Sequence, residues 1–171
     1  MMSGLPGTGK STVAKRLAAQ IDGAIVVATD VVRKELFPVP TYADEENGAT
    51  YRAVQQRLLD LLGTGKIAIF DATNLRAQYR AWADLAQAQT ECKLLIVQTI
   101  SAEKITKQRL EQRNAHGNDE SDADYEIYKQ LQETVEPIAR PHLTIRTDTH
   151  YEADFAQAVE AVQSLRVGTT Q

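Results

Sequence analysis

Short apolar runs alternate with helical periods along this chain, and the alternation limits the possible folds more than any other feature. The apolar runs cover residues 24–28, 66–70, 93–97 and 142–145. Each is nearly continuous in apolar side chains, which is typical of strands buried on both faces of a parallel sheet. Between them, apolar residues recur at three- and four-residue steps, which indicates amphipathic helices. The sequence therefore predicts one doubly wound α/β domain over residues 1–171.

The composition is that of an ordinary globular protein, with 43% hydrophobic and 25% charged residues in a chain of 171. A net charge of −4 argues against a broad nucleic-acid-binding surface, although a small cationic pocket is compatible with it. Cys92 is the single cysteine, so an internal disulfide is excluded and a reducing compartment fits. No apolar run reaches the ~18 residues of a membrane span, and no signal peptide is recognisable. We expect a cytoplasmic protein with no membrane partner.

A glycine-rich stretch, GLPGTGKST at residues 4–12, fits the pattern G-x-x-x-x-G-K-[S/T] in full. Its glycines let successive N–H groups turn toward phosphate oxygens, and the helix expected from about residue 11 to 21 adds its positive N-terminal end. Lys10 can reach the β- and γ-phosphates, and the Ser11 hydroxyl can ligate Mg²⁺. The expected phosphate-binding residues are Gly4, Pro6, Gly7, Thr8, Gly9, Lys10, Ser11 and Thr12. Only Met1–Ser3 precede the loop, so a very short or incomplete first strand is expected.

The same four letters, GTGK, recur at residues 63–66, but this stretch is not expected to bind phosphate. Asp60 stands where the first glycine of the pattern should be, and Ile67 offers no hydroxyl after the lysine. The segment also runs from a helix into a strand, the reverse of a phosphate-binding loop. Its glycines instead predict a helix C-terminus after Leu62.

Two polar residues just past the apolar run 24–28 are candidates for catalysis. Asp30 and Arg33 are three residues apart, so on a helical turn their side chains face the same way. In such folds ligands bind at the C-terminal edge of the sheet, where Asp30 can accept the proton of an attacking hydroxyl. Arg33 can hold a substrate anion or the phosphoryl group in transfer. Asp30 would otherwise cap the next helix, but after a phosphate-binding loop we favour catalysis.

An acidic residue, Asp71, ends the run 66–70 in the position of the second metal-site element of phosphate-binding loop proteins. Its carboxylate can hold a Mg²⁺-bound water or the Ser11 hydroxyl. Thr73 and Asn74 follow as candidates to line the pocket. Asn74 can alternatively cap the next helix.

Two arginines lie four residues apart on a helix predicted at about residues 102–114. Arg109 and Arg113 share a face, and a polar segment follows them. This pattern predicts a lid over about residues 109–124, whose arginines stabilise transition-state charge. The alternative is a solvated helix face with Glu111 among its charges.

A further stripe at helical spacing contains Tyr79 and Trp82. Aromatic residues at such spacing usually belong to the apolar face of a helix. We therefore predict that these two side chains lie in the core and do not bind a ligand.

Four segments together resemble a P-loop kinase family: GLPGTGKST, TDVVRKEL, DATNLRAQYR and the RLEQR…SDA segment. This family includes the kinase domain of polynucleotide kinases, the zeta-toxin-like proteins and small kinases known as AAA-type ATP-binding proteins. The resemblance covers nearly the whole chain, in the right order. It implies a three-layer α/β/α P-loop fold with a parallel sheet of strand order 2-3-1-4-5 and a helical lid.

The same resemblance implies roles for single residues. It implies Asp30 as general base and Arg33 as a substrate- or phosphate-binding residue. Lys10 and Ser11 would be the phosphate and Mg²⁺ residues, and the lid arginine would be Arg109 or Arg113. Two more arginines look like those near the acceptor in polynucleotide kinases, namely Arg76 and Arg80.

We therefore expect an ATP- and Mg²⁺-dependent kinase that transfers the γ-phosphoryl group to a hydroxyl of a small molecule. One alternative acceptor is a nucleic-acid 5′-hydroxyl, against which the acidic charge counts. Another alternative is a nucleotide-binding module that serves a fused or partner domain and transfers nothing itself. Preference for ATP over GTP rests on the resemblance alone. The residues that choose the acceptor are expected in the segment 37–52, in the lid and near Asp71, but they show no pattern that identifies it.

Overall fold

Strands and helices alternate as the sequence predicts in the computed structural model, which describes residues 1–116 and 121–167. The strands are β1 (Met2–Ser3), β2 (Ala24–Ala28), β3 (Ile67–Asp71), β4 (Val97–Ile100) and β5 (Leu143–Arg146). The helices are α1 (Lys10–Gln20), α2 (Thr29–Leu36), α3 (Asp44–Gly63), α4 (Ala77–Thr90), α5 (Glu103–His116), α6 (Tyr125–Gln132) and α7 (Glu152–Val167).

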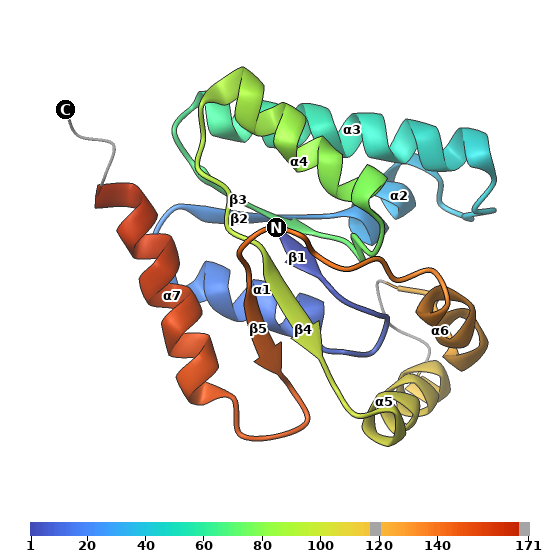
Figure 1. Cartoon of the computed structure of the whole chain (residues 1–171). Coiled ribbons are helices and arrows are strands. Elements are labelled where there is room, and N and C mark those ends of the chain that lie inside the picture. The colour runs from blue at the N-terminus through green and yellow to red at the C-terminus, as the bar shows by residue number, and fades with distance from the viewer. Residues whose placement is uncertain (117–120, 168–171) are drawn as a thin grey trace.

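The helices cover both faces of the strands. Helices α3 and α4 lie side by side on one face, and α1 and α7 lie on the other (Figure 1). Helices α5 and α6 pack against each other at one end of the molecule. Every strand pair is parallel, so the α/β class with a parallel sheet is confirmed.

The predicted strand order 2-3-1-4-5 is not matched, because the described strands form two sheets. One has the order β1-β4-β5 and the other pairs β2 with β3. The missing ladder is between β3 and β1, and β1 is only two residues long. Hydrogen bonds outside a ladder join the two sheets there. The Asn74 amide donates to the Met2 carbonyl (2.7 Å), and the Gly4 N–H donates to the Thr73 carbonyl (3.0 Å).

Asn74 therefore has a different role from either of those predicted for it. It is fully buried, has a positive φ of 46°, and accepts a hydrogen bond from the Ser3 hydroxyl at its main-chain oxygen (3.3 Å). Helix α4 begins at Ala77, with Arg76 as N-cap and no side-chain capping bond. Asn74 thus ties β1 to the segment after β3 and neither caps a helix nor lines the cleft described below.

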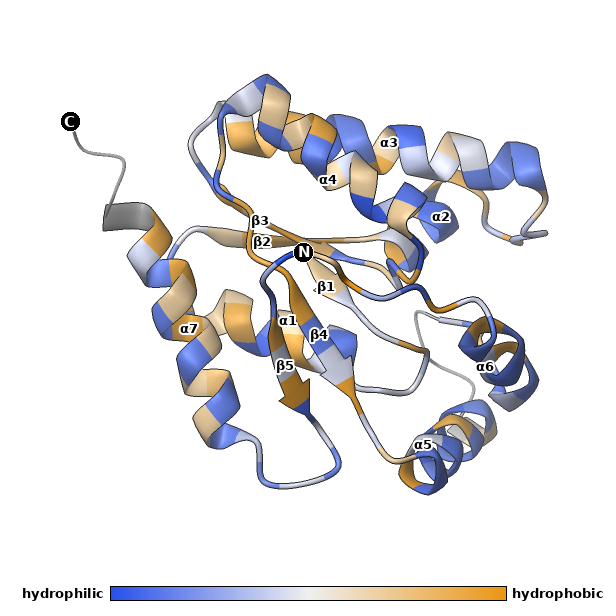
Figure 2. Cartoon of the chain, in the orientation of Figure 1, coloured by the Kyte–Doolittle hydropathy of each residue, from blue (hydrophilic) through white to orange (hydrophobic). Residues whose placement is uncertain are grey.

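The apolar core lies on both sides of the strands, which are largely hydrophobic (Figure 2). Burying each large apolar side chain contributes roughly 1.5–3 kcal/mol. The cluster against α1 and α7 contains Met2, Val13, Ala14, Leu17, Ile21, Ile69, Val97, Ile145, Phe155 and Ala158. The cluster under α2 and α3 contains Val27, Val32, Val54, Leu58, Phe70 and Ala72. The strand predicted at residues 93–97 begins four residues later in the structure. It is β4, which starts at Val97 and pairs with β1 and β5.

The second GTGK is the end of a helix, as predicted. Helix α3 ends at Gly63, and Gly65 has a positive φ of 72°. The N–H of Gly65 donates to the Leu62 carbonyl (2.9 Å), and that of Lys66 donates to the Leu61 carbonyl (3.1 Å). These bonds satisfy the last carbonyls of the helix.

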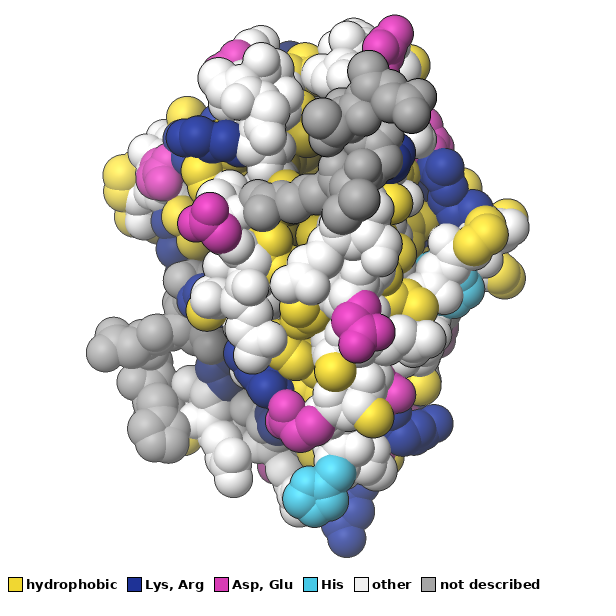
Figure 3. Space-filling model, turned by 90° about the vertical axis from the view of Figure 1, so that its left-hand side faces the viewer, with side chains coloured by type: hydrophobic (Ala, Val, Ile, Leu, Met, Phe, Trp, Pro, Cys, Tyr) yellow, Lys and Arg dark blue, Asp and Glu magenta, His cyan; other side chains and the backbone are white. Residues whose placement is uncertain are grey.

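Hydrophobic side chains show between the polar ones on the face that carries the C-terminal end of α7 (Figure 3). Cys92 is half-buried. It lines a cavity of about 110 Å³ with Met1, Leu62 and Leu165 among its neighbours. Among the described residues, no helix combines the length and the apolarity that crossing a membrane requires.

Candidate active site

A cleft of about 1160 Å³ brings most of the candidate residues together. Its walls come from the glycine-rich loop, the ends of β2 and β3, and helices α2 to α6. It is lined by Pro6, Gly7, Gly9, Lys10, Ser11, Thr12, Asp30, Arg33, Asp71, Thr73, Arg109 and Arg113. The candidates outside its lining are Gly4, Thr8, Asn74, Arg76 and Arg80.

The glycine-rich loop needs its glycines for conformation and for space. Gly4, Gly7 and Gly9 all have positive φ angles, of 149°, 75° and 85°. A Cβ on Gly4 would lie 2.5 Å from the Thr99 carbonyl oxygen, and one on Gly7 would lie 2.9 Å from the Leu110 side chain. Residues with a side chain rarely adopt such angles. At these three positions the loop therefore presents main chain without a side chain.

Thr8 holds this loop in place through contacts with Thr99 and Thr147. It is buried, its hydroxyl donates to the Leu5 carbonyl (2.7 Å), and it lies 2.8 Å from the Thr99 hydroxyl of β4. The Thr147 hydroxyl, just after β5, donates to the Thr8 carbonyl (2.8 Å). Thr8 therefore anchors the loop to two strand ends, and its side chain is not available to a phosphate.

Lys10 is the cation at the centre of the loop. Its ammonium donates to the Leu5 carbonyl (3.0 Å), which closes the loop on itself. Burial lowers its pKa, and the charges of Asp71 and Asp30 act in the opposite direction. Asp30 and Asp71 therefore lie close enough to Lys10 to act on its charge, and any phosphate bound by the loop would meet all three groups.

Asp30 sits in the first turn of α2 and does not cap that helix, whose N-cap is Ala28. Burial raises the pKa of Asp30, while a hydrogen bond with Ser121 and the charge of Lys10 oppose the shift. A half-buried carboxylate with a raised pKa is a stronger base than an ordinary aspartate, as a proton acceptor requires. This geometry favours the catalytic interpretation over the capping one.

The residues predicted to hold Mg²⁺ fit a hard cation. Asp71 is only 5% exposed, and among the described residues its carboxylate accepts no hydrogen bond. Ser11 is exposed in the first turn of α1 and lines the same cleft. No group of three or more acidic, histidine or cysteine side chains gathers within the described ranges. A cation there would take these two oxygens together with ligand oxygens and water, as Mg²⁺ does at phosphate sites.

Arg33 lines the cleft but is already paired, with a residue that sequence reasoning missed. Its Nη1 donates to Glu46 Oε1 at 2.8 Å, and the two side chains are 7% and 6% exposed. Burial would raise the pKa of Glu46, but hydrogen bonds from Thr41, Arg33 and Tyr42 outweigh it and lower that pKa to about 2. The guanidinium also lies over the Tyr42 ring, 4.8 Å from its centroid. Its Nε is buried and has no hydrogen-bond partner among the described residues.

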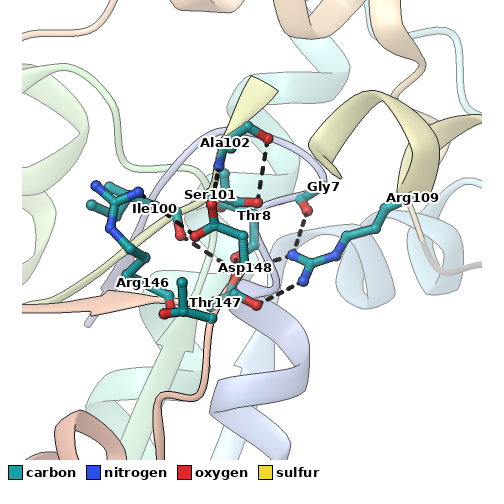
Figure 4. Close-up of polar contacts among 10 residues, drawn as sticks. Gly7, Thr8, Ile100, Ser101, Ala102, Arg109, Arg146, Thr147 and Asp148 are labelled. Atoms are coloured by element: carbon teal, nitrogen blue, oxygen red, sulfur yellow. Dashed lines mark hydrogen bonds and ion pairs between the residues drawn. The ribbon is translucent and has the colours of Figure 1, made fainter. Parts of the chain in front are cut away.

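Arg109 reaches from α5 to the glycine-rich loop (Figure 4). It donates to the Thr147 carbonyl (2.7 Å), the Thr147 hydroxyl (3.0 Å) and, at 3.5 Å, the Gly7 carbonyl. Its guanidinium therefore joins α5, the loop and the segment after β5. Because main-chain oxygens already engage it, Arg109 holds this wall of the cleft together.

The lid was predicted at about residues 109–124, and its second half contacts the opposite wall of the cleft. Arg113 donates to the Ala123 carbonyl. Asp122 accepts hydrogen bonds from the Tyr42 hydroxyl (2.6 Å) and from Lys34 (3.0 Å). Positions 117–120 of the predicted lid lie outside the described residues. The contacts at Asp122 connect the end of the segment to α2 and to the turn before α3.

Arg80 has a structural role, contrary to its predicted place near the acceptor. It is buried and donates to the carbonyls of Asn74 (3.1 Å), Leu75 (2.8 Å) and Pro137 (2.8 Å). These bonds fix the segment between β3 and α4 against the chain that follows α6. Arg76 is half-buried and likewise lies outside the lining of the cleft.

Tyr79 and Trp82, predicted to belong to the core, line the cleft with Tyr51 of α3. The Tyr51 and Tyr79 rings stack with centroids 5.5 Å apart and planes 7° apart. The Tyr51 and Trp82 rings are 6.3 Å apart and inclined by 16°. We call these three side chains the aromatic cluster. No signal in the sequence relates Tyr51 to the other two, because it comes from another helix.

The fold has many counterparts among solved structures. Kti12 from Chaetomium thermophilum, in complex with ADP-AlF3, has a TM-score of 0.74 at 18% identity and covers 96% of each chain. The Mycobacterium tuberculosis APS kinase CysC, in complex with AMPPNP and APS, has a TM-score of 0.65 at 18% identity and covers 96% of this chain and 94% of its own. A gluconokinase from Sinorhizobium meliloti 1021 has a TM-score of 0.67 at 16% identity, with 99% and 95% covered. These likenesses establish a P-loop kinase fold.

Sequence comparison gives relatives of greater length. An uncharacterized protein of Mycobacterium tuberculosis is 32% identical over 139 residues, which cover 74% of this chain and 27% of that protein. The chain thus spans about a quarter of the length of the curated relatives it matches. The AAA domain family matches residues 1–138. Because this match includes the glycine-rich loop together with Asp30 and Asp71, the chain belongs to the AAA domain family of proteins with a P-loop kinase fold.

Proposed function

We propose that the protein is a kinase that transfers the γ-phosphoryl group of ATP to a hydroxyl of a small molecule. One observation carries the proposal: a single cleft holds the phosphate-binding loop and, across from it, a half-buried carboxylate with a raised pKa. The P-loop kinase fold of its neighbours supports the same reaction class. Within the AAA domain family, we place the chain with the polynucleotide kinases and zeta-toxin-like proteins, on the segments quoted above.

In the proposed reaction, the N–H groups of the loop and Lys10 bind the triphosphate. Asp30 accepts the proton of the acceptor hydroxyl as the oxygen attacks the γ-phosphorus. A bond forms between that oxygen and phosphorus, the bond from phosphorus to the β-phosphate oxygen breaks, and ADP leaves with the electron pair. Arg113, in the charged environment of Lys10, is better placed than Arg109 to stabilise the developing charge.

Mg²⁺ is the proposed metal cofactor, and Ser11 and Asp71 are the residues that would hold it. When bound, it neutralises charge on the phosphate oxygens. The two residues act differently toward it. Ser11 presents a neutral hydroxyl from the first turn of α1, whereas Asp71 supplies a buried negative charge at the end of β3.

The remaining parts of the proposal concern the chain as a whole. We propose one kinase domain over residues 1–171, with a lid at about 109–124, acting in the cytoplasm on a small-molecule acceptor. The Asp122 contacts with Lys34 and Tyr42 support a lid that closes on the acceptor side. A fused or partner domain fits the greater length of the curated relatives.

The test is a phosphoryl-transfer screen with Mg²⁺-ATP labelled at the γ-phosphate, against sugars, nucleosides, aminoglycosides and 5′-hydroxyl oligonucleotides. Asp30→Asn, which keeps the shape of the side chain, should reduce transfer by roughly 10²–10⁴-fold, the range for a lost general base. Asp60→Asn is the matched control, because Asp60 is an exposed carboxylate bonded to Gln56.

Three results would contradict the proposal in different ways. Labelling of the oligonucleotides alone would replace the small-molecule acceptor with a nucleic-acid 5′-hydroxyl. ATP binding without a labelled acceptor, and unchanged in Asp30→Asn, would indicate a nucleotide-binding module. Equal transfer by the wild type and Asp30→Asn would remove Asp30 as the base.

A further inference from the structure

The proposed mechanism uses one end of the cleft and leaves the other without a role. The loop, Asp30 and Asp71 account for the phosphate end. The opposite wall is formed by α3 and α4, which contribute Asp44, Asn47, Gly48, Tyr51, Arg52, Tyr79 and Trp82 to the lining. An acceptor must lie between this wall and Asp30, so the chemistry of the wall indicates what the acceptor is.

Parallel aromatic rings dominate this wall. The three rings of the aromatic cluster are nearly parallel, within 7° and 16°, and all are only partly buried. Their planes are thus nearly parallel, and part of each side chain remains exposed. A flat ring laid against an exposed ring face would extend the stack, and stacking of a flat heterocycle on aromatic side chains is a strong and common form of recognition.

The aromatic cluster is next to the proposed general base. Burial raises the pKa of Tyr51 to about 12, and the charges of Tyr79, Arg33 and Asp30 also act on its hydroxyl. A molecule stacked on the cluster would therefore share the cleft with Asp30, whose charge acts on Tyr51. The hydroxyl of an acceptor must reach this carboxylate.

Outside the aromatic cluster, the same wall offers few polar groups to a sugar or another polyol. They are the side chains of Asp44, Asn47 and Arg52, and the Asn47 amide already donates to the Tyr42 carbonyl (3.0 Å). Within the cluster, the polar groups are the two tyrosine hydroxyls and the indole N–H of Trp82. A site that selects a polyol needs several placed hydrogen-bonding groups, because each hydroxyl of the bound ligand must be satisfied. Gly48 leaves this part of the wall without a side chain, and a Cβ there would meet the Arg52 guanidinium at 3.3 Å.

We propose that the acceptor is an alcohol that carries a flat aromatic or heteroaromatic ring, which stacks on the aromatic cluster while its hydroxyl meets Asp30. This inference rests on the proposed kinase function. Arg52, for which no ion pair or hydrogen bond is seen among the described residues, lies at the edge of this subsite, where it can hold a polar substituent of the ring.

The experiment separates binding from transfer. Trp82 is the single tryptophan of the chain, so its fluorescence reports occupancy of this wall directly. Matched alcohols would be titrated in the presence of a non-hydrolysable ATP analogue: uridine beside methyl riboside, and an aryl-substituted diol beside its cyclohexyl counterpart. The ring-bearing member of each pair should quench Trp82, and its partner should not. With Mg²⁺-ATP, the same ring-bearing alcohols should be phosphorylated with the lower KM.

Substitutions then test whether the aromatic cluster is responsible. Tyr79→Leu should raise the KM for the ring-bearing alcohol about tenfold or more, the effect expected for a lost stacking partner, and should leave the KM for ATP unchanged. Tyr151→Leu is the matched control, because Tyr151 packs against the core cluster of α1 and α7, away from the cleft.

The outcomes distinguish this inference from the kinase proposal. Phosphorylation of ring-free polyols, with no quenching and no effect of Tyr79→Leu, would overturn the aromatic acceptor and leave the kinase. Quenching by ring-bearing alcohols without phosphoryl transfer to any of them would confirm the aromatic subsite as a binding site and overturn the kinase. An equal response to both members of each pair would show that the ring is not recognised.

Discussion

The two ends of the cleft are built from different parts of the polypeptide. The phosphate end is built around main chain, shaped by three glycines with positive φ and anchored through Thr8, and Lys10, Asp30 and Asp71 add charged side chains to it. The acceptor end is side chain, made of the Arg33–Glu46 ion pair and of an aromatic cluster drawn from two helices. A main-chain site demands certain residues at fixed spacing, whereas a side-chain site leaves the spacing free. The phosphate end should therefore tolerate few changes, and the acceptor end can vary with its ligand.

The largest effect is expected at the phosphate end. Lys10→Ala removes the one lysine in the loop, and phosphoryl transfer should fall by roughly 10²–10³-fold, the usual cost of losing a group that stabilises transition-state charge. The fold should be retained, since the only hydrogen bond of the Lys10 ammonium within the described residues is to the Leu5 carbonyl. Steady-state kinetics and a thermal melt measure both.

Lys15→Ala on the same helix is the control, because Lys15 is exposed and outside the cleft. Its kinetics should match the wild type. If Lys10→Ala transferred phosphate at the wild-type rate, the loop could not be the phosphate end of the cleft in the way proposed.

The same contrast explains how much the sequence could predict. The glycine pattern identified the loop at 4–12, because residues with a side chain rarely adopt those φ angles and a Cβ at Gly4 or Gly7 would come closer than 3.0 Å to its neighbours. The acidic residues at strand ends were also recognisable, since the carboxyl ends of parallel strands meet at one edge. Both features can be read from short segments of sequence, because each depends on the local course of the main chain.

What the sequence could not provide are contacts between distant segments. Glu46 pairs with Arg33, and Tyr51 lines the cleft, only because α3 packs beside α2 and α4, and nothing in the run 37–52 marks either residue. The two-residue β1 left no ladder to β3, so the strand order inferred from resemblance is not matched, and Asn74 bridges the gap. Arg80 looked like a ligand-binding arginine but satisfies three carbonyls instead.

The pH dependence of kcat/KM tests whether Asp30 is the general base. The ordinary pKa of the side chain is 3.8, and burial raises it in the folded protein. A base must be deprotonated, so kcat/KM should fall about tenfold per pH unit below the raised pKa. The acid limb should thus lie above pH 3.8, where an ordinary aspartate would still be charged. A profile of kcat/KM between pH 4 and 9, at constant ionic strength, measures this.

An acid limb at or below the ordinary value would mean that Asp30 is not buried as described or is not the base. Stability must be followed in parallel, because the raised pKa also means that charging Asp30 destabilises the fold. Loss of activity with an unchanged melting temperature would assign the acid limb to catalysis.

A moderate effect is expected at the ion pair of the acceptor end. Glu46→Gln keeps the shape of the side chain but removes the charge that holds Arg33, so kcat/KM should fall about tenfold, in the range for a hydrogen bond between charged groups. Glu46 has an ordinary pKa of 4.5, lowered to about 2 in the folded protein. Its contribution to stability is therefore present above pH 4.5 and is lost as the pH falls toward 2.

Glu45→Gln is the control at the neighbouring, exposed position. Chemical denaturation between pH 2 and 7 should give a wild-type stability that declines below pH 4.5, and a flatter curve for Glu46→Gln. Identical curves for the three proteins would show that the Arg33–Glu46 pair does not set this dependence.

The smallest effect is expected at Gly48. A substitution there separates the space left for the acceptor from the stability of the fold. Glycine inside a helix costs about 1 kcal/mol relative to alanine, and Gly48 lies within α3 without a positive φ. A Cβ there would meet only the end of the flexible Arg52 side chain, at 3.3 Å. Gly48→Ala should therefore stabilise the fold by about 1 kcal/mol, yet raise the acceptor KM a few-fold because the methyl group enters the cleft.

Gly63→Ala provides the comparison, because a Cβ at Gly63, the last residue of α3, would have no neighbour within 4 Å and would lie outside the cleft. Its acceptor KM should stay at the wild-type value, even where the melting temperature rises. A glycine that costs stability and leaves room for a ligand is what an acceptor end built from side chains would keep. If Gly48→Ala stabilised the protein and also left the acceptor KM unchanged, the acceptor would have to lie elsewhere in the cleft, nearer the lid than the wall of α3.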